Sequence, residues 1–117
     1  MLSFRYRFHG HNSLRYVYKN GQAIRSHLIT LKYIANPNRS KPRFAVVVSK
    51  KVHKSAIGRN RIRRRIYEVL RRELPELQPK HDMVFLVFSS EVLALPHDEL
   101  LDTIRQLIQA AHIYKNE

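Results

Sequence analysis

Apolar residues recur near the start of the chain at a spacing that predicts a short helix. Leu14, Val17 and Tyr18 would share one face of a helix over residues 14–19, because positions three and four apart lie on the same side of a helix. Asn20-Gly21 follows and supplies the left-handed residue at which such a helix prefers to stop.

Three further segments carry the apolar pattern of β-strands. They cover residues 26–34, 44–49 and 83–88. The second contains Ala45-Val46-Val47-Val48, a continuous apolar run that predicts burial on both faces of the strand. A basic segment rich in turn residues, 36–42, separates the first two strands.

Two longer helices are predicted over residues 58–74 and 96–111. In the first, apolar side chains fall on one arc of the helix and mostly basic ones on the opposite arc, which predicts an outward cationic ridge. The apolar arc consists of Ile62, Ile66, Val69, Leu70 and Leu74, and the basic arc of Arg61, Arg64, Arg65, Glu68, Arg71 and Arg72. Pro96 suits the first turn of the second helix, where Asp98 and Glu99 favour the positive end of the helix dipole. The buried stripe of this second helix consists of Leu100, Ile104, Leu107, Ile108 and Ala111.

The order of these elements, α-β-β-α-β-α, predicts an α/β fold. We expect a two-layer α-β sandwich, with the helices packed on one face of a small sheet and the other face open. A chain of 117 residues is long enough for a single core, so one domain over residues 1–117 is expected.

The charge of the chain is large and unevenly distributed. The net charge is +13, and residues 1–72 hold 19 of the 22 Lys and Arg but only one acid, Glu68. Residues 73–117 hold the other eight acids and three bases. Because like charges oppose compaction, this distribution favours a polyanion-binding surface in the first part and an ordinary solvated scaffold in the second.

The densest basic stretch is residues 50–72, with ten Lys and Arg. Guanidinium groups match phosphate oxygens in bidentate geometry, and the turn before a helix can add backbone N–H groups. The connection between Lys50 and Arg61 is therefore a candidate phosphate-binding segment. The alternative, a merely solvated helix face, usually mixes charges of both signs at i,i+4 spacing, and here Glu68 is the single acid.

Aromatic residues alternate with bases in the first part of the chain. This mixture is typical of surfaces that stack unpaired bases and follow their phosphates, which favours single-stranded RNA over duplex DNA. The alternative for each aromatic is an ordinary place in the core. The aromatics are Phe4, Tyr6, Phe8, Tyr16, Tyr18, Tyr33 and Phe44, and the bases are Arg5, Arg7, Arg15, Lys19, Lys32 and Arg43.

No catalytic or metal-ligating residue is assigned to the protein. His9 and His11 flank Gly10 without a third ligand nearby. The carboxylates at positions 98, 99 and 102 could imitate a nuclease metal site, but their place in a first helical turn is explained by the helix dipole. Ser49, Ser89 and Ser90 have no evident His and Asp partners for a catalytic triad.

The chain contains no cysteine, which excludes disulfides and thiolate chemistry. No run approaches the roughly 20 apolar residues of a membrane helix, and the first residues lack the apolar stretch of a signal peptide. These features predict a cytoplasmic protein without a membrane partner.

Two motifs at the centre of the chain resemble a known family. Ser49-Lys50-Lys51 at the end of a predicted strand is followed by Arg59-Asn60-Arg61-Ile62-Arg63-Arg64 at the opening of a predicted helix. This arrangement resembles the arginine-asparagine-arginine motif of the bacterial ribonuclease P protein. Residues 14–21 and the segment near His112-Ile113-Tyr114 are also similar to the family, so the resemblance covers nearly the whole chain.

The resemblance implies a fold of the ribosomal protein S5 domain 2 type, with a left-handed β-α-β crossover. It implies a cleft between the first helix and the sheet that holds the single-stranded 5′ leader of precursor tRNA, lined by Leu14, Tyr18, Tyr33 and Phe44. The register of the first strand is open by one residue, and a slip would exchange its two faces. The residues implied to bind the RNA subunit are Lys50, Lys51, Lys54, Arg59, Asn60, Arg61, Arg63 and Arg64.

The activity implied by the resemblance belongs to a holoenzyme. The protein would help ribonuclease P RNA remove the leader from precursor tRNA, while Mg²⁺ ions held on the RNA carry out the hydrolysis. The protein alone would be inactive and bind no cofactor, and no obligate protein partner is expected.

Three other functions stay open at this point. A ribosomal or other structural RNA-binding protein would have a similar composition. A protein nuclease would need clustered carboxylates on the basic face, where residues 1–72 offer only Glu68. A DNA-binding module is disfavoured because the basic helix has few Asn or Gln side chains that read base edges.

Overall fold

The computed structural model of the chain describes residues 6–8 and 11–115. Its helices are α1 (His11–Asn20), α2 (Ala56–Glu73) and α3 (His97–Ala110), and its strands are β1 (Gln22–Arg25), β2 (Ile29–Ala35), β3 (Arg43–Val48) and β4 (His81–Val87). Two short 3-10 helices, η2 (Leu74–Glu76) and η3 (Ser90–Leu93), precede and follow β4. The described helices include none that is both long and apolar enough to cross a membrane.

The strands form one sheet in the order β1-β2-β4-β3. β2 pairs antiparallel with both β1 and β4, whereas β3 and β4 are parallel neighbours. Parallel neighbours need a long crossover connection, and α2 provides it here. The predicted β-α-β unit is therefore present in the fold.

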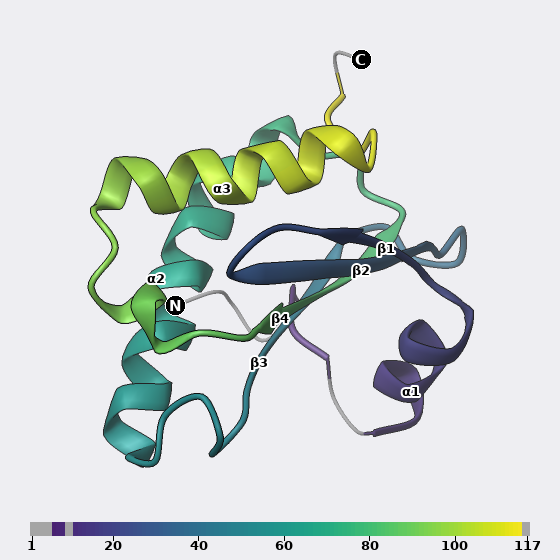
Figure 1. The fold of residues 1–117 in the computed structure, drawn as a ribbon. Coiled ribbons are helices and arrows are strands. Elements are labelled where there is room, and N and C mark those ends of the chain that lie inside the picture. The colour runs from purple at the N-terminus through teal and green to yellow at the C-terminus, as the bar shows by residue number, and fades with distance from the viewer. Residues whose placement is uncertain (1–5, 9–10, 116–117) are drawn as a thin grey trace.

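The main core lies between one face of the sheet and helices α2 and α3, as Figure 1 shows. Alternate residues of β2, β3 and β4 point into it, because successive side chains of a strand face opposite sides. Its largest fully buried side chains are Phe44, Phe85, Ile29, Leu31, Ile62, Ile66, Leu70, Leu77, Met83, Leu100, Ile104 and Ile108.

Helix α1 packs on the opposite face of the sheet, against β2 and β4 (Figure 1). Val17 of α1 and Val84 of β4 are fully buried there, outside the core cluster formed with α2 and α3. The expectation that all helices share one face was therefore wrong. The face opposite the main core is only partly covered, which leaves room for a binding surface.

The predicted elements agree with the observed ones within three residues at each end, except that β1 was missed. The predicted first strand began at Ser26, but this residue belongs to the turn of a β1-β2 hairpin. Its backbone N–H donates to the carbonyl of Ile29 at 3.0 Å, and its hydroxyl to the same oxygen at 2.6 Å. The observed order is thus α-β-β-β-α-β-α.

Candidate nucleic-acid interface

The loop between β3 and α2 is held by hydrogen bonds within its own backbone and by its side chains. The carbonyl of Ser49 accepts from the N–H groups of Val52 and His53 at 3.1 and 3.3 Å. Ser55 is the N-cap of α2, and its hydroxyl accepts from two N–H groups of the first turn at 3.2 and 3.3 Å. Arg59 Nη1 donates to the carbonyls of His53 and Lys54, both at 2.9 Å. The loop backbone is therefore fixed before any ligand binds.

This loop displays positive charge at the start of α2. Lys50, Lys51 and Lys54 are exposed, and the first turn of α2 contains no acid. The partial positive charge of the helix end thus adds to the lysines and is not neutralised by the helix's own side chains. A phosphate group would find both backbone and side-chain donors here.

Gly58 allows the loop to pack closely on α2. A Cβ atom at this position would lie 2.2 Å from Cε1 of His53, too close for any real contact. His53 Nδ1 in turn accepts the backbone N–H of Ser55 at 3.2 Å. The glycine therefore makes space for the imidazole that supports the cap of the helix.

The exposed side of α2 carries the predicted arginine cluster. Asn60, Arg61 and Arg64 are exposed, and the half-exposed Arg63 donates from Nη1 to Asn60 Oδ1 at 2.6 Å. All eight residues predicted to bind the RNA subunit thus lie in the β3-α2 loop and the first half of α2. Arg59 and Arg63 are partly engaged with the chain itself, whereas the other basic members project into solvent.

Arg65 does not belong to this exposed cluster, although the helical pattern placed it on the basic arc. Its guanidinium donates from Nη1 to the carbonyls of Val92 and Leu93 at 2.5 and 3.0 Å, and from Nη2 to that of Leu95. It ties α2 to the segment after β4. Its role is structural, and the placement of Arg65 on an outward cationic ridge was wrong.

The far end of the basic arc is less positive than the sequence suggested. Arg71 forms an ion pair with Glu68 at 3.1 Å, and both side chains are about half exposed. The hydrogen bond from Arg71 lowers the pKa of Glu68 below its usual value. The uncompensated charge is therefore concentrated at the beginning of α2.

On the other face of the sheet, Tyr18 of α1 meets Lys32 of β2. The ammonium of Lys32 lies 5.5 Å from the centre of the Tyr18 ring and donates to the Tyr18 carbonyl at 3.4 Å. Burial raises the pKa of the Tyr18 phenol above its usual value, because desolvation disfavours the charged form. Leu14 is half-buried on the same helix. Tyr18 and Leu14 thus belong to α1, as the predicted cleft requires.

Tyr33 and Phe44 lie on the wrong face of the sheet for that cleft. Phe44 is fully buried in the main core, and Tyr33 packs against the same core while its hydroxyl donates to Gln22 Oε1 at 2.7 Å. Lys32, one residue before Tyr33, contacts α1 instead. The prediction was shifted by one residue along the strand, which exchanges the two faces of the sheet. The assignment of these two aromatics to the cleft was therefore wrong.

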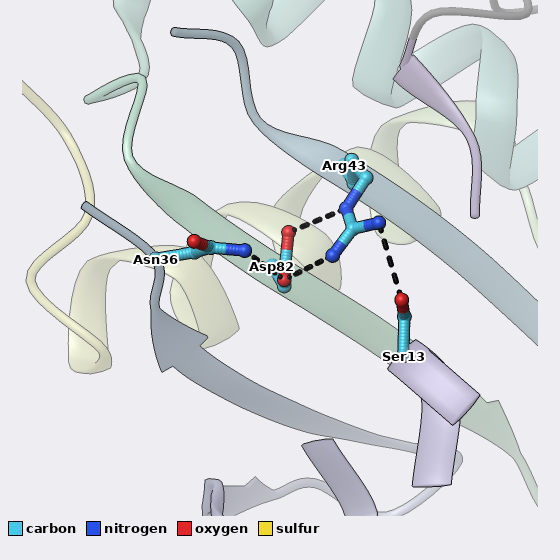
Figure 2. A network of polar contacts seen from close by, with 4 residues as sticks. All are labelled: Ser13, Asn36, Arg43 and Asp82. Carbon is cyan, nitrogen blue, oxygen red and sulfur yellow. Dashed lines mark hydrogen bonds and ion pairs between the residues drawn. The ribbon is translucent and has the colours of Figure 1, made fainter. Parts of the chain in front are cut away.

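A polar network joins the beginning of α1 to the sheet, as Figure 2 shows. Arg43 donates from Nε and Nη2 to the two carboxylate oxygens of Asp82 at 2.9 and 2.7 Å. Asn36 Nδ2 donates to Asp82 Oδ2 at 2.9 Å, and Arg43 Nη1 reaches the Ser13 hydroxyl at 3.4 Å. Arg43 Cζ also lies 4.6 Å from the centre of the Phe8 ring.

The α1 side of the sheet also contains a hollow of about 320 Å³, beyond the part that α1 covers. It lies at the carboxyl ends of β3 and β4, beside the basic loop. Phe88 is 61% exposed at its rim, although it is a large apolar side chain. The hollow is lined by Val47, Ser49, Lys51, Val52, Leu86, Val87 and Phe88.

Phe88 was not recognised as a site residue from the sequence. The available signal was its spacing from Leu86. Residues two apart along a strand lie on the same face, so Phe88, just beyond the end of β4, shares with Leu86 the face opposite the main core. That signal becomes informative only once the exposed face of the strand is known.

Other chemistry has little support in the described residues. Among them no group of three His, Asp or Glu side chains is placed to hold a metal ion. His9 and Phe4 lie outside the described part of the chain, as does the side chain of His11. Asp98, Glu99 and Asp102 are exposed at the start of α3, across the sheet from the hollow and from α1.

Comparisons with known proteins agree on one family. The family model described as Ribonuclease P matches residues 2–112. The ribonuclease P protein component of Carboxydothermus hydrogenoformans is 35% identical over 102 residues, which cover 86% of this chain and 84% of that protein. The component from Chloroflexus aurantiacus is 36% identical over 106 residues, covering 91% of this chain and 77% of that one.

Solved structures show the same fold at lower sequence identity. The Staphylococcus aureus RNase P protein has a TM-score of 0.83 at 18% identity, covering 94% of this chain and 98% of that chain. The RNase P protein from Thermotoga maritima has a TM-score of 0.79 at 19% identity, covering 89% and 96%.

Proposed function

The chain belongs to the bacterial ribonuclease P protein family and is a subunit of ribonuclease P, and from this premise we propose that its two basic surfaces bind two different RNAs. One surface is the β3-α2 loop with the start of α2, which we assign to the catalytic RNA. The other is the partly open face of the sheet beside α1, which we assign to the 5′ leader of precursor tRNA.

The observation that carries the leader assignment is a row of aromatic and cationic groups on one face of the sheet. Tyr18 with Lys32 lies at one end, and Phe88 lies at the rim of the hollow at the other, where Lys51 of the β3-α2 loop marks the border between the two surfaces. Aromatic rings stack on bases of any sequence, and lysines follow the phosphates between them. An unpaired strand fits such a face better than a duplex, whose bases are not available for stacking.

The assignment of the catalytic RNA rests on the exposed charge at the start of α2. Lys54, Arg61 and Arg64 project from a backbone that is already fixed, so binding a rigid RNA surface costs little backbone conformational entropy. Guanidinium groups can also bind phosphates in bidentate geometry.

The proposed reaction is hydrolysis of one phosphodiester bond, which releases the leader and leaves the mature 5′ end of the tRNA. Magnesium ions held on the catalytic RNA supply the chemistry. The protein, acting in the cytoplasm, reduces repulsion between the two RNAs and holds the leader, which lowers both the magnesium requirement and the substrate dissociation constant.

The test is cleavage of a 5′-labelled precursor tRNA at low magnesium by a bacterial ribonuclease P RNA, with and without the protein. The protein is expected to restore cleavage at the mature 5′ end and to be inactive alone. Arg61→Ala and Arg64→Ala should weaken this effect for every substrate. Phe88→Ala should raise KM more for substrates with a long leader than for a substrate whose leader is a single nucleotide. Lys115→Ala, which removes an exposed base on the α3 side, is the matched control.

Two outcomes would contradict the proposal. If the protein bound both RNAs without restoring cleavage, a structural RNA-binding role would replace it. Cleavage without any RNA subunit would instead indicate a protein nuclease.

A further inference from the structure

Arg43 differs from the other arginines near the proposed leader surface because its charge is already compensated. Its side chain is 14% exposed and that of Asp82 only 4%. The two residues are directly paired neighbours of the parallel strands β3 and β4, so the fork of the guanidinium meets both carboxylate oxygens. The hydrogen bond to Asp82 raises the pKa of Arg43 further. This arginine therefore adds little net charge to a phosphate-binding surface.

The same guanidinium reaches out of the sheet to the segment at the beginning of α1. Nη1 contacts the Ser13 hydroxyl, and Cζ lies over the Phe8 ring at 4.6 Å from its centre (Figure 2 shows the Ser13 contact). Asn36, which follows β2, holds the same carboxylate as Arg43. The network thus links the ends of β2, β3 and β4 to α1 through one side chain.

The two ends of α1 are attached to the sheet in different ways. Its carboxyl end continues through Gly21 directly into β1, and the Gly21 N–H donates to the Val17 carbonyl at 2.8 Å. Its amino end meets the sheet through Arg43, by way of Ser13 and the preceding Phe8. Buried Val17 holds the middle of α1 on the sheet, so weakening the Arg43 contacts would free the amino end of the helix to move relative to the sheet.

We propose that Arg43 is a positioning residue for leader binding, which fixes the amino end of α1 over the sheet and so sets the shape of the leader surface. Asp82 acts by holding Arg43, which contacts α1 at Ser13 and also contacts Phe8, a residue that precedes the helix. The inference rests on the proposed function, because the leader is the ligand whose affinity depends on this shape.

The first experiment measures affinity for precursor tRNA with a leader and for the same tRNA without one, in the holoenzyme. Arg43→Lys keeps the charge but loses the two parallel hydrogen bonds to Asp82, and Ser13→Ala removes only the contact of Arg43 with α1. Each is expected to weaken binding of the leader-bearing substrate about three- to tenfold, the loss expected for one orienting charge-assisted contact. Binding of the leaderless tRNA and of the catalytic RNA should not change.

The matched control is Arg105, a second arginine that is hydrogen-bonded to a buried carboxylate. Arg105 donates from Nε and Nη2 to Glu73 at 3.1 and 3.2 Å, in the layer of α2 and α3 on the other side of the sheet. Arg105→Lys should lower stability without any leader-specific effect. An equal leader-specific loss in this control would assign the effect to general destabilisation and overturn the proposal.

A second experiment follows α1 itself and does not depend on RNA. The chain has no cysteine, so Asn12→Cys at the start of α1 and Gln109→Cys on α3 provide two exposed sites for spin labels. The distance distribution between the labels should broaden in Arg43→Lys and in Ser13→Ala, and stay narrow in Arg105→Lys. An unchanged distribution would overturn the proposal whatever the binding data show.

The two experiments separate the inference from the function beneath it. Suppose that the unsubstituted protein binds tRNA with a leader more tightly than tRNA without one. A variant that broadens the distance distribution but loses none of this preference then overturns the role of Arg43 alone. If the unsubstituted protein binds both tRNAs equally well, the assignment of the leader surface is wrong, and the role of Arg43 in leader binding is overturned with it.

Discussion

At Gly21 the chain passes so close to its neighbours that one added carbon atom would not fit. A Cβ atom there would lie 2.6 Å from the carbonyl oxygen of Val17 and 2.8 Å from that of Tyr33. The sequence correctly marked this glycine as the end of α1, but the reason was wrong. Its φ lies outside the left-handed region, and the glycine is required for the close approach of two backbones.

Gly21→Ala is therefore expected to lower the free energy of unfolding by about 1–3 kcal/mol, the usual cost of overpacking. Urea unfolding of the two proteins measures the difference. Gly58→Ala is the comparison, because its new Cβ would meet only the His53 side chain, which can turn away. Alanine also favours a helix, so the loss there should be smaller. Equal losses would mean that backbone crowding at Gly21 is not the cause.

Glu73 is a buried carboxylate whose pKa depends on its hydrogen-bond partners. Burial alone raises its pKa, but hydrogen bonds from Arg105 and from the Tyr114 hydroxyl outweigh this and hold the pKa below the ordinary value of 4.5. The Tyr114 hydroxyl donates to Oε1 at 2.7 Å. A depressed pKa means that the unfolded chain binds more protons, so this stabilisation is complete above about pH 4.5 and is lost as the pH falls through the folded value.

Glu73→Gln should thus be less stable at pH 7, by about 1–2 kcal/mol because Arg105 is half-exposed. The difference between the two proteins should shrink as the pH is lowered below about 4.5. Urea unfolding at several pH values between neutral and acid gives both curves. If the difference in free energy of unfolding between the two proteins stayed constant with pH, Glu73 would not contribute to the acid sensitivity of the fold.

Arg64 and Arg65 are neighbours on α2 with different roles, because Arg65 is bonded to the chain itself and Arg64 is exposed. Arg65→Ala should lower stability by about 1–3 kcal/mol, since three carbonyl oxygens lose a charged donor. Arg64→Ala should leave the melting temperature nearly unchanged. It should instead weaken RNA binding and reduce the slope of log K against log salt by about 0.7–0.9. Thermal melting and binding at several salt concentrations test the pair, and an exchange of the two effects would contradict the assignment.

The sequence predicted most elements correctly, and the failures share a cause. The periodicity of α2 and α3 reports which residues face the core, so their positions could be read directly. β1 is a four-residue edge strand with mostly exposed side chains, and it carries no alternation to detect. Its existence depends on hydrogen bonds with β2.

The site was predicted less well where it depends on contacts between distant segments. The basic loop and the start of α2 are continuous in sequence, so their residues could be grouped without a structure. Phe44 of β3 faces the main core, whereas Phe88, just after β4, lies on the opposite face of the sheet, and a one-residue shift in register would exchange the two faces. The partners of Arg65 are backbone carbonyls about 30 residues away, which no side-chain pattern reveals.

For the whole molecule, a net charge of +13 implies that the folded state is sensitive to anions. Sulfate that binds the basic surface of the folded state should raise the melting temperature, by a few degrees at about ten times its dissociation constant. Thermal melting in sulfate and in chloride at equal ionic strength measures this. The increase should be smaller in Arg61→Ala. A melting temperature that does not respond to sulfate would contradict the prediction.

The acidic residues of α3 also affect how the protein meets its partner. Asp98, Glu99 and Asp102 are exposed on a helix that Figure 1 shows at the top of the molecule, while the β3-α2 loop and α1 lie at the bottom. This separation of charge forms an electric dipole across the sheet. In the field of an RNA, the dipole turns an approaching protein so that the basic side arrives first. Encounters in the wrong orientation become rarer, and the association rate should fall steeply as added salt shortens the reach of that field.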